Sequence, residues 1–334
     1  MGSTNRFLLT GAGFTHNFGG PLATQLWAMI FNHPRVQASP SLRSQFLDNF
    51  DFEDVYYSVM EDEHLSDARD GLDVAVSEAY DAIDATVRDF TFRTGSPFPV
   101  NIYKVQNLIA AFSGTSSDPG FFFTLNQDLF VERHYYNGPR PVLPAIQLHG
   151  QWFGGNSSAP LTETDYCQVP AENELKQEKS KFTTGHEFCY LKLHGSCNWR
   201  SSGGSRQMVI GRGKEGKIQR EPLLAWYFDV FREVISKGNR RGLVIGYGFA
   251  DKHVNDVLAE AVVKHGLRLS VVSPESPSSF HEGLLGKHRG QEIWTGLGAY
   301  YECSLAQLFP ADQSESSLWG AMRREFFAGV PLPQ

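Results

Sequence analysis

Residues 5–31 have the sequence NRFLLTGAGFTHNFGGPLATQLWAMIF, and this stretch indicates the fold class of the whole chain. The apolar run at 7–10 has the length and composition of a buried strand. Gly11 and Gly13 follow at once, and residues 22–31 place apolar side chains at helical spacing. The stretch therefore predicts a strand, a glycine turn and a helix, which is the opening unit of an α/β fold.

Five further apolar segments have the same strand character, and each is bounded by glycine, proline or asparagine. They are GFFFTLNQD at 120–128, FCYLKLHGS at 188–196, RGLVIGYGF at 241–249, LRLSVVSPE at 267–275 and LGAYYECS at 297–304. Helical stretches lie between several of them, and this alternation predicts a mainly parallel sheet covered by helices on both faces. We therefore expect one Rossmann-like, doubly wound α/β domain over residues 1–334.

Two stretches depart from the alternation and are expected to be insertions within this domain. Residues 34–113 have a helical pattern throughout. Between residues 72 and 90 the apolar residues follow steps of three and four, which is typical of helices that pack against a core. These residues are Leu72, Val76, Tyr80, Ile83, Val87 and Phe90. Residues 154–187 are polar, and we expect a loop insertion there.

The composition excludes several classes of protein. With 41% hydrophobic and 13% aromatic residues the chain can bury a large core. A formal net charge of −7 argues against broad electrostatic capture of nucleic acid. The basic residues between 200 and 220 are the best local candidate for such contact, and a solvated loop also explains them. Since no apolar run is long enough to span a bilayer and no cleavable leader is present, we expect a cytoplasmic protein.

The cysteines give no sign of a disulfide framework or a metal site. Cys167, Cys189, Cys197 and Cys303 are irregularly spaced and include no C-x-x-C pair. Structural zinc sites and disulfide-rich domains both depend on regular cysteine spacing. We therefore expect reduced, mostly buried thiols and no metal ligands.

The glycine turn is a candidate phosphate site. A dinucleotide fingerprint needs G-x-G-x-x-G, and His16 stands where the third glycine belongs, so a dehydrogenase is not indicated. Gly11 and Gly13 would still let the backbone approach a pyrophosphate, with helix N–H groups and the Thr15 hydroxyl as donors. A plain structural turn explains two glycines equally well.

Polar residues follow the next two strands where each strand ends. Asn126 and Asp128 come directly after a run of aromatic residues, and His194 follows the strand at 188–193. Open α/β sheets place ligand chemistry at such strand ends. A structural role would also account for a single histidine, and His149 in a second LHG tripeptide is a rival for any catalytic role.

Two later strands end in further candidates. Gly246 and Gly248 mark a second place where backbone can approach a ligand, and Asp251 is placed to cap the following helix. Ser273, with Glu275 close behind, suits the hydroxyls of a ribose. An ST-turn explains this last pair equally well.

Together, these motifs resemble the sirtuin superfamily, and specifically its prokaryotic sirtuin-like domains. GAGFT resembles the family's GAG-x-S/T loop, TLNQD its T-x-N-x-D strand end, and LKLHGS its catalytic His-Gly. IGYGF and VVSPE resemble its later glycine loop and its adenosine-ribose strand. The matches occur in the family's order, from residue 7 to about 303. The resemblance implies a sirtuin-like fold with NAD+ as the substrate.

The resemblance also assigns roles to residues. It makes Asn126 and His194 the catalytic pair and Asp128 a contact of the nicotinamide carboxamide. Asn126 could position a water and a ribose hydroxyl, and His194, expected to titrate near neutrality, could take the proton. It also implies that the pyrophosphate is bound by Gly11, Ala12, Gly13 and Thr15. Gly246 and Ser273 would line the ribose and adenosine side of the site.

The chain departs from deacylating sirtuins in ways that bear on its substrate. It lacks two C-x-x-C zinc pairs after the catalytic histidine and an F-G-E-x-L-P-like segment for an acyl-lysine peptide, and Leu125 replaces the usual glutamine. We therefore expect no zinc, and water as the acceptor, in an NAD+ glycohydrolase that releases nicotinamide and ADP-ribose. Two alternatives stay open: an NAD-dependent protein deacylase or ADP-ribosyltransferase, and a non-catalytic sensor of NAD+ or ADP-ribose.

The resemblance implies a biological setting as well. Prokaryotic sirtuin-like domains of this kind serve antiphage defence by depleting NAD+, and a sensor keeps them inactive until it is triggered. Because the sirtuin-like core leaves almost no room for a sensor in this chain, we expect a separate regulatory partner. The resemblance implies a HerA-type hexameric ATPase or, as the alternative, a short Argonaute. We also expect a homo-oligomer, no membrane contact, and contact with nucleic acid only through the partner.

Overall fold

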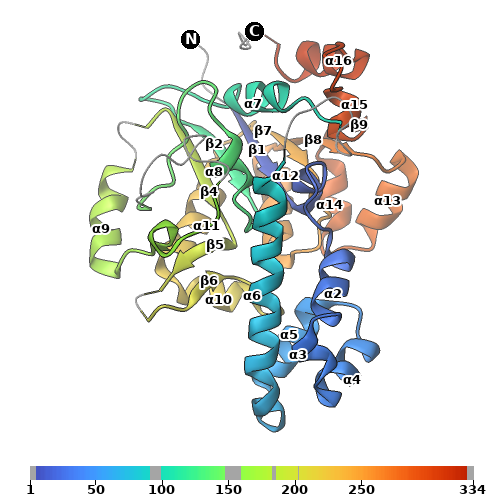
Figure 1. The fold of residues 1–334 in the computed structure, drawn as a ribbon. Helices are drawn as coiled ribbons and strands as arrows, with labels where there is room; N and C mark the ends of the chain where they lie inside the picture. The colour runs from blue at the N-terminus through green and yellow to red at the C-terminus, as the bar shows by residue number, and fades with distance from the viewer. Residues whose placement is uncertain (1–4, 91–98, 147–158, 183–185, 202, 329–334) are drawn as a thin grey trace.

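The protein is built on a six-stranded sheet in which all neighbouring strands are parallel (Figure 1). The computed structural model describes residues 5–90, 99–146, 159–182, 186–201 and 203–328. All six strands that the sequence predicts are present. They are β1 (Arg6–Thr10), β2 (Gly120–Thr124), β4 (Phe188–Lys192), β7 (Arg241–Ile245), β8 (Arg268–Ser273) and β9 (Leu297–Glu302).

The strand order β4-β2-β1-β7-β8-β9 is that of a Rossmann-like sheet. The first strand lies in the centre, where Phe7 of β1 is in register with Phe121 of β2 and with Gly242 of β7. The doubly wound α/β class predicted from the sequence is therefore confirmed. Since the order reverses at β1, the crevice beyond the carboxyl ends of β1 and β7 is where such sheets bind ligands.

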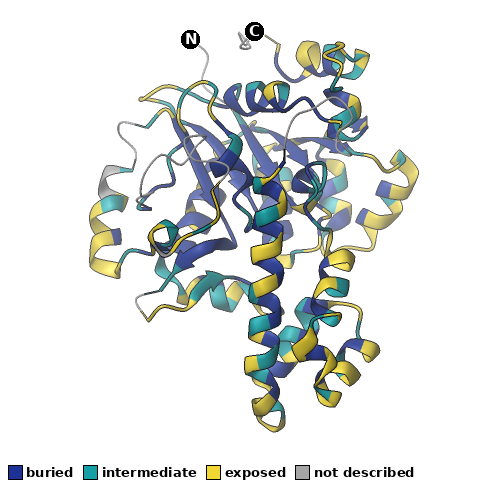
Figure 2. Ribbon diagram, in the orientation of Figure 1, coloured by how far each residue is buried: buried dark blue, intermediate teal, exposed yellow. Residues whose placement is uncertain are grey.

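Burial on both faces explains why the strands are continuously apolar. Phe7, Leu8 and Leu9 of β1 and Phe122 and Phe123 of β2 have no solvent-exposed surface. Figure 2 shows the strands as a buried interior covered by helices that are exposed only on their outer sides. A parallel sheet needs this two-sided cover, since neither of its faces carries alternating polar residues.

The helices that follow or flank the strands are short or of moderate length. Among the described residues, no helix is both long enough and apolar enough to cross a bilayer. The helices around the sheet are α1 (Ala12–His16), α7 (Ile102–Ala110), α8 (Phe130–His134), α11 (Pro222–Ile235), α12 (Lys252–His265), α13 (Pro277–Leu285), α14 (Gly290–Thr295), α15 (Leu305–Leu308) and α16 (Ser317–Glu325).

A helical lobe projects from one end of the sheet (Figure 1). It comprises α2 (Ala23–Phe31), α3 (Pro34–Gln37), α4 (Pro40–Asp48), α5 (Phe52–Glu61), η1 (Glu63–Leu65) and α6 (Ser66–Arg88). The stretch 34–113, predicted as a helical insertion, thus supplies α3 to α6 of the lobe and also α7, which leads back into β2. Leu72, Val76 and Ile83 of α6 are buried, as their helical spacing predicts.

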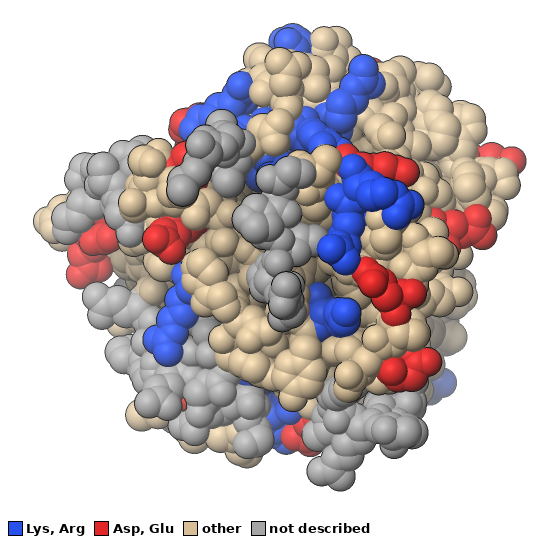
Figure 3. Space-filling model, turned by 90° about the horizontal axis from the view of Figure 1, so that it is seen from above, with Lys and Arg blue, Asp and Glu red and all other residues tan. Residues whose placement is uncertain are grey.

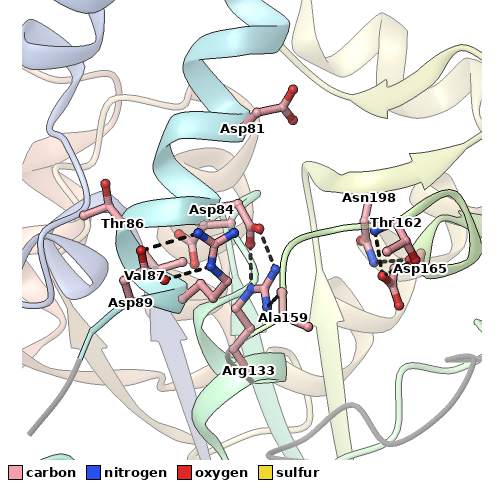
Figure 4. A network of polar contacts seen from close by, with 12 residues as sticks. Asp81, Asp84, Thr86, Val87, Asp89, Arg133, Ala159, Thr162, Asp165 and Asn198 are labelled. Atoms are coloured by element: carbon pink, nitrogen blue, oxygen red, sulfur yellow. Dashed lines mark hydrogen bonds and ion pairs between the residues drawn. The ribbon is translucent and has the colours of Figure 1, made fainter. Parts of the chain in front are cut away.

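A buried ion pair joins the helical lobe to the sheet domain. Arg133 of α8 donates through Nε and Nη2 to the two carboxylate oxygens of Asp84 on α6, at 2.7 and 2.5 Å (Figure 4). The two side chains are 0% and 4% exposed. Because a lone buried charge would be strongly unfavourable, each partner depends on the other, and the pair holds α6 against α8.

The stretch 154–187, predicted as a polar loop, is not a loop throughout its described part. It contains η2 (Glu163–Asp165), β3 (Cys167–Gln168) and α9 (Glu172–Lys181). β3 belongs to a second, three-stranded sheet with β5 (Gly195–Arg200) and β6 (Arg206–Met208), and α10 (Lys214–Arg220) follows this sheet. Pairing with β5 gives order to a segment whose composition alone indicates a loop.

Two of the basic residues between 200 and 220 are engaged with the helical lobe. Arg206 pairs with Asp81 of α6 at 2.8 Å. Lys214 pairs with Glu53 of α5 at 2.8 Å. These contacts pair two members of the best local candidate for a nucleic-acid patch with carboxylates and attach α10 and β6 to the lobe.

Figure 3 views the molecule from above, over the face where the parallel strands begin. Lys and Arg side chains gather there, and β1, β7 and β8 begin with Arg6, Arg241 and Arg268. Arg6 donates to the carbonyl of Phe326, and Arg241 donates to the carbonyl of Glu325. Arg6 and Arg241 therefore attach the C-terminal end of α16 to the sheet, at the end of the strands opposite to the predicted site.

Candidate active site

The carboxyl ends of five neighbouring strands carry the motifs predicted from the sequence. Gly11 follows β1, Asn126 follows β2, His194 follows β4, Gly246 follows β7 and Ser273 ends β8. Parallel strands end at the same edge of a sheet, so all five lie along one edge. The helical lobe leaves the sheet from this edge as well (Figure 1).

Two glycine turns meet at the centre of this edge. The Gly13 N–H donates to the Gly246 carbonyl at 2.9 Å, and the Gly11 N–H donates to the Ile245 carbonyl at 3.1 Å. Gly246 has a φ of +66°, and a Cβ atom there would lie 2.1 Å from the backbone nitrogen of Phe14. Glycine is therefore required at 246 both by the backbone conformation and by the close approach.

We expect Gly246→Ala to destabilise the protein by about 1–3 kcal/mol or more, because the methyl group overpacks the contact in a left-handed backbone. Gly248→Ala is the matched control, since a Cβ at Gly248 meets no atom within 4 Å. Its effect should stay within about 0.5 kcal/mol. Urea unfolding of both variants measures the difference, and equal unfolding free energies would contradict the packing argument.

The other residues assigned to the pyrophosphate lie on α1, a helix of five residues. Ala12 is its first residue and is exposed, whereas Thr15 is buried. The helix of residues 22–31 begins only at Ala23, after a separate turn. A pyrophosphate-binding role for Gly11, Ala12, Gly13 and Thr15 stays a prediction.

Thr15 joins the first glycine turn to the end of β2. Its hydroxyl donates to Oδ2 of Asp128 at 2.9 Å and accepts from Nδ2 of Asn126 at 2.8 Å, although Asn126 lies 111 residues away in the chain. One hydroxyl can serve both partners because it is a donor and an acceptor. The contact orients the Asn126 amide, and in the described part of the chain nothing donates to its Oδ1.

The carboxylate of Asp128 is already engaged within the protein. Oδ1 accepts from the N–H of Phe130, and Oδ2 accepts from Thr15. Burial raises the pKa of this carboxyl group, and the nearby Lys192 ammonium opposes the shift. The structure thus shows a carboxylate that orients Thr15, and its contact with a nicotinamide carboxamide stays a prediction.

Gln127, which sequence reasoning did not select, fixes the position of His194. Its Nε2 donates to the carbonyls of His194 and Val209 at 3.1 and 2.9 Å. The backbone carbonyl of Gln127 accepts from the N–H of Cys197 at 2.9 Å. The turn that carries His194 is therefore tied to the end of β2. An amide next to a buried strand was the available signal, because a buried amide needs partners.

His194 lies in a tight turn between β4 and β5 and is only 4% exposed. The turn requires Gly195, which has a φ of +78° and where a Cβ would lie 2.1 Å from the Gln207 carbonyl oxygen. Nε2 of His194 lies 2.9 Å from Nε2 of His253 on α12. The rival histidine, His149, lies outside the described residues.

A chain of charged groups extends from Asp251, two residues before His253, to the helical lobe. Asp251 accepts from Nζ of Lys214 at 2.7 Å, and the same ammonium contacts Glu53 of α5 at 2.8 Å. The prediction that the Asp251 side chain caps α12 is wrong, since it makes no capping hydrogen bond. Lys214 binds this carboxylate instead. These groups come from α5, α10 and α12, so no local sequence pattern could group them.

Burial sets the protonation of the two histidines. It lowers the pKa of His194 to about 3 and that of His253 to about 4, although Asp251 opposes both shifts. Burial opposes the ionisation of Asp251, but His194 and Lys214 outweigh it and lower its pKa to about 2. Titration of His194 near neutrality is therefore a wrong prediction for the free protein, because a buried imidazolium loses its hydration.

Ser273 ends β8 in an ST-turn. Its hydroxyl accepts from the N–H of Glu275 at 3.3 Å, and the Tyr300 hydroxyl donates to the Glu275 carbonyl at 2.7 Å. The structural alternative for this pair is therefore present. A contact between Ser273 and a ribose stays a prediction.

Two cavities lie beside other parts of the chain. One of about 870 Å³ is lined by residues that include Val142, Glu174 and Trp226. The other, of about 270 Å³, is lined by residues that include His16 and Met29. Neither cavity is lined by the residues of the strand-end network, and the candidate site therefore rests on the hydrogen bonds described above.

Comparison with known proteins supplies a limited likeness. No protein-family model and no curated protein matches the chain. Among solved structures, a mutant Sir2 homologue in complex with ADP-ribose is similar to it, with 14% identity and a TM-score of 0.42 over 98% of this chain and 94% of that chain. A likeness this weak carries no argument about ligand or activity. The strand order of the sheet itself establishes the fold class.

Proposed function

We propose that this protein is an NAD+ glycohydrolase that releases nicotinamide and ADP-ribose. The observation that carries the proposal is the junction at the ends of β1, β2 and β4. Thr15, Asn126 and Asp128 share one hydrogen-bond network there, and Gln127 ties His194 to it. Rossmann-like sheets bind dinucleotides along this edge, in the crevice beyond the carboxyl ends of β1 and its neighbours. The resemblance of the motifs to sirtuin-like domains supports NAD+ as the substrate.

Each group has a defined part in this chemistry. The glycosidic bond breaks with its electron pair going to the nicotinamide nitrogen, which leaves an oxocarbenium-like ribose for water to attack. Asn126, held by Thr15 through Nδ2, offers Oδ1 to that water or to a ribose hydroxyl. His194 is neutral, so its ring has a lone pair that can accept the proton that water loses.

Product analysis tests the proposal against its alternatives. Purified protein is mixed with NAD+, with and without an acetyl-lysine peptide, and the products are separated by chromatography. Nicotinamide and free ADP-ribose formed without peptide would support the glycohydrolase. Acetyl-ADP-ribose formed only with peptide would replace it with a deacylase, and ADP-ribose attached to protein would replace it with a transferase. Binding of NAD+ without turnover, with or without the partner described below, would indicate a sensor.

Asn126→Ala should lower kcat for NAD+ hydrolysis by about 10²–10³-fold, the usual loss when one positioned polar group is removed from a transition state. Asn137→Ala is the matched control, because Asn137 also donates to a side chain, Oδ1 of Asn107, at 3.0 Å, but away from the strand ends. Initial rates of nicotinamide release give both values. Equal rates for the two variants would exclude Asn126 from the reaction.

We further propose that a partner subunit controls this activity in antiphage defence, where depletion of NAD+ would halt an infected cell. The helical lobe supports the idea of a partner surface, since Leu22, Met29, Leu47 and Phe50 are exposed on it at 37%, 38%, 55% and 72%. It also reaches the site through Glu53. A HerA-type hexameric ATPase is the proposed partner, and any contact with nucleic acid would come through it.

The partner proposal is tested by adding such an ATPase, or a short Argonaute as the alternative, to the purified chain. Size-exclusion chromatography would show whether the chain forms a homo-oligomer or a mixed complex, and the NAD+ assay would show whether its rate changes. A complex that forms with neither protein would contradict both candidates. The glycohydrolase proposal has its own assay and does not depend on this result.

A further inference from the structure

We propose that His194, Asp251 and His253 form a binding site for a divalent transition metal ion such as Zn2+. Their ligand atoms, two imidazole nitrogens and one carboxylate oxygen, lie within 4.8 Å of one another. Two histidines and one carboxylate are a ligand set that proteins use for zinc and related metals. This site has no relation to the C-x-x-C zinc pairs that the sequence lacks.

The spacing of the two imidazoles fits a metal. Metal–nitrogen bonds of about 2.1 Å put two ligand nitrogens about 3.0 Å apart at a right angle and about 3.4 Å apart at the tetrahedral angle. The Nε2 atoms of His194 and His253 are 2.9 Å apart. The carboxylate oxygen of Asp251 must approach by on the order of 1 Å to complete the site. It makes no capping hydrogen bond, so this approach breaks no contact with the helix backbone.

The charges around the cluster also suit a cation. Lys214 contributes one positive charge, but it is paired with two carboxylates, those of Asp251 and Glu53. A carboxylate has two oxygens, so Asp251 can accept from Lys214 through one and bind a metal through the other. The Asp251 side chain is 13% exposed, so this ligand is in contact with solvent.

Without a metal, the two facing nitrogens form one hydrogen bond, in which one neutral imidazole donates its N–H and the other accepts. With a metal, both nitrogens offer lone pairs to the ion. The metal would then occupy the lone pair of His194 and stop it from accepting a proton. This last consequence, inhibition by the metal, rests on the proposed glycohydrolase function, whereas binding of the metal does not.

Metal binding is measured directly on the full chain, with Co2+ followed by visible absorption and Zn2+ followed by calorimetry. We expect one Co2+ per chain with the spectrum of nitrogen and oxygen ligands. His253→Gln and Asp251→Asn should each weaken binding by more than about tenfold, the loss that even an outer partner of a metal ligand brings. His288→Gln is the matched control, because His288 also pairs with a carboxylate, that of Asp256, at 2.7 Å, on the surface.

The metal site would be overturned if Co2+ caused no spectral change, or if thiolate charge-transfer bands showed that cysteines bind the ion. Equal affinity in the wild type and both ligand variants would also overturn it. Circular dichroism of each variant shows whether it is folded, and two independent ligand variants protect the test against failure of one. If the glycohydrolase is active, Zn2+ should inhibit it and EDTA should restore it. Metal binding to a chain without NAD+ turnover would separate the two proposals.

Discussion

His194→Ala is expected to lower kcat for NAD+ hydrolysis by about 10²–10⁴-fold, the usual contribution of a positioned proton acceptor. The backbone of the turn should survive the change. Its anchoring hydrogen bonds, from Gln127 and from the N–H of Val209, are accepted by the backbone carbonyl of His194 and not by its ring. The change leaves the proposed substrate contacts of the other strand ends in place, so KM should change little while kcat falls.

The effect of His194→Ala is compared with that of a control substitution at a histidine outside the site, and both are measured without metal ions. His64→Ala is suitable because His64 is exposed in η1 at the far end of the helical lobe. Rates are measured with EDTA, under conditions in which the wild type turns over NAD+. A His194→Ala protein that is folded and keeps kcat within about threefold of the wild type would show that another group takes the proton.

Lys192→Met is expected to destabilise the fold by about 3–5 kcal/mol, the usual effect of breaking a buried ion pair. Lys192 ends β4, two residues before His194, and its Nζ contacts Glu132 of α8 at 2.8 Å. The two side chains are 0% and 2% exposed, so methionine would leave a buried carboxylate without its cation. Lys192 also donates to the carbonyl of Asp128, and the change therefore loosens the site as well.

Two further variants separate this loss from a general effect of removing lysine. Lys264→Met removes the exposed pair of Lys264 and Glu260, whose side chains are 64% and 44% exposed, and should change stability by less than about 0.5 kcal/mol. Lys192→Met combined with Glu132→Leu should recover much of the loss, because no buried charge is then left alone. Urea unfolding gives all the free energies. A loss under about 1 kcal/mol in Lys192→Met would contradict the argument.

Much of the candidate site was predictable because each strand end is marked locally. The change from Phe121, Phe122 and Phe123 to Asn126 and Asp128 shows in the sequence where a buried strand stops. In a parallel sheet such ends share an edge, so polar residues after different strands can be grouped without coordinates. The hydrogen bonds of Thr15 with Asn126 and Asp128 agree with that grouping.

The residues that sequence reasoning missed have no such local mark. The role of Gln127 depends on carbonyls that are 67 and 82 residues away in the chain. His253 lies in the first turn of a helix, where nothing in the sequence sets it apart. Asp251 looked like a cap, and only the approach of Lys214 from another helix shows that its carboxylate is used elsewhere.

The sequence by itself determined the six strands, their parallel class and the turns that carry the polar residues, because hydrophobic runs, glycines and strand ends are local features. Only the tertiary structure decided which strands are neighbours, and so placed Gly13 against Gly246 and His194 against His253. It also decided the charge state of His194, since a pKa depends on burial and on neighbours from distant segments. Residue types specify the chemistry that is possible, and the packing of distant segments specifies which of it can occur.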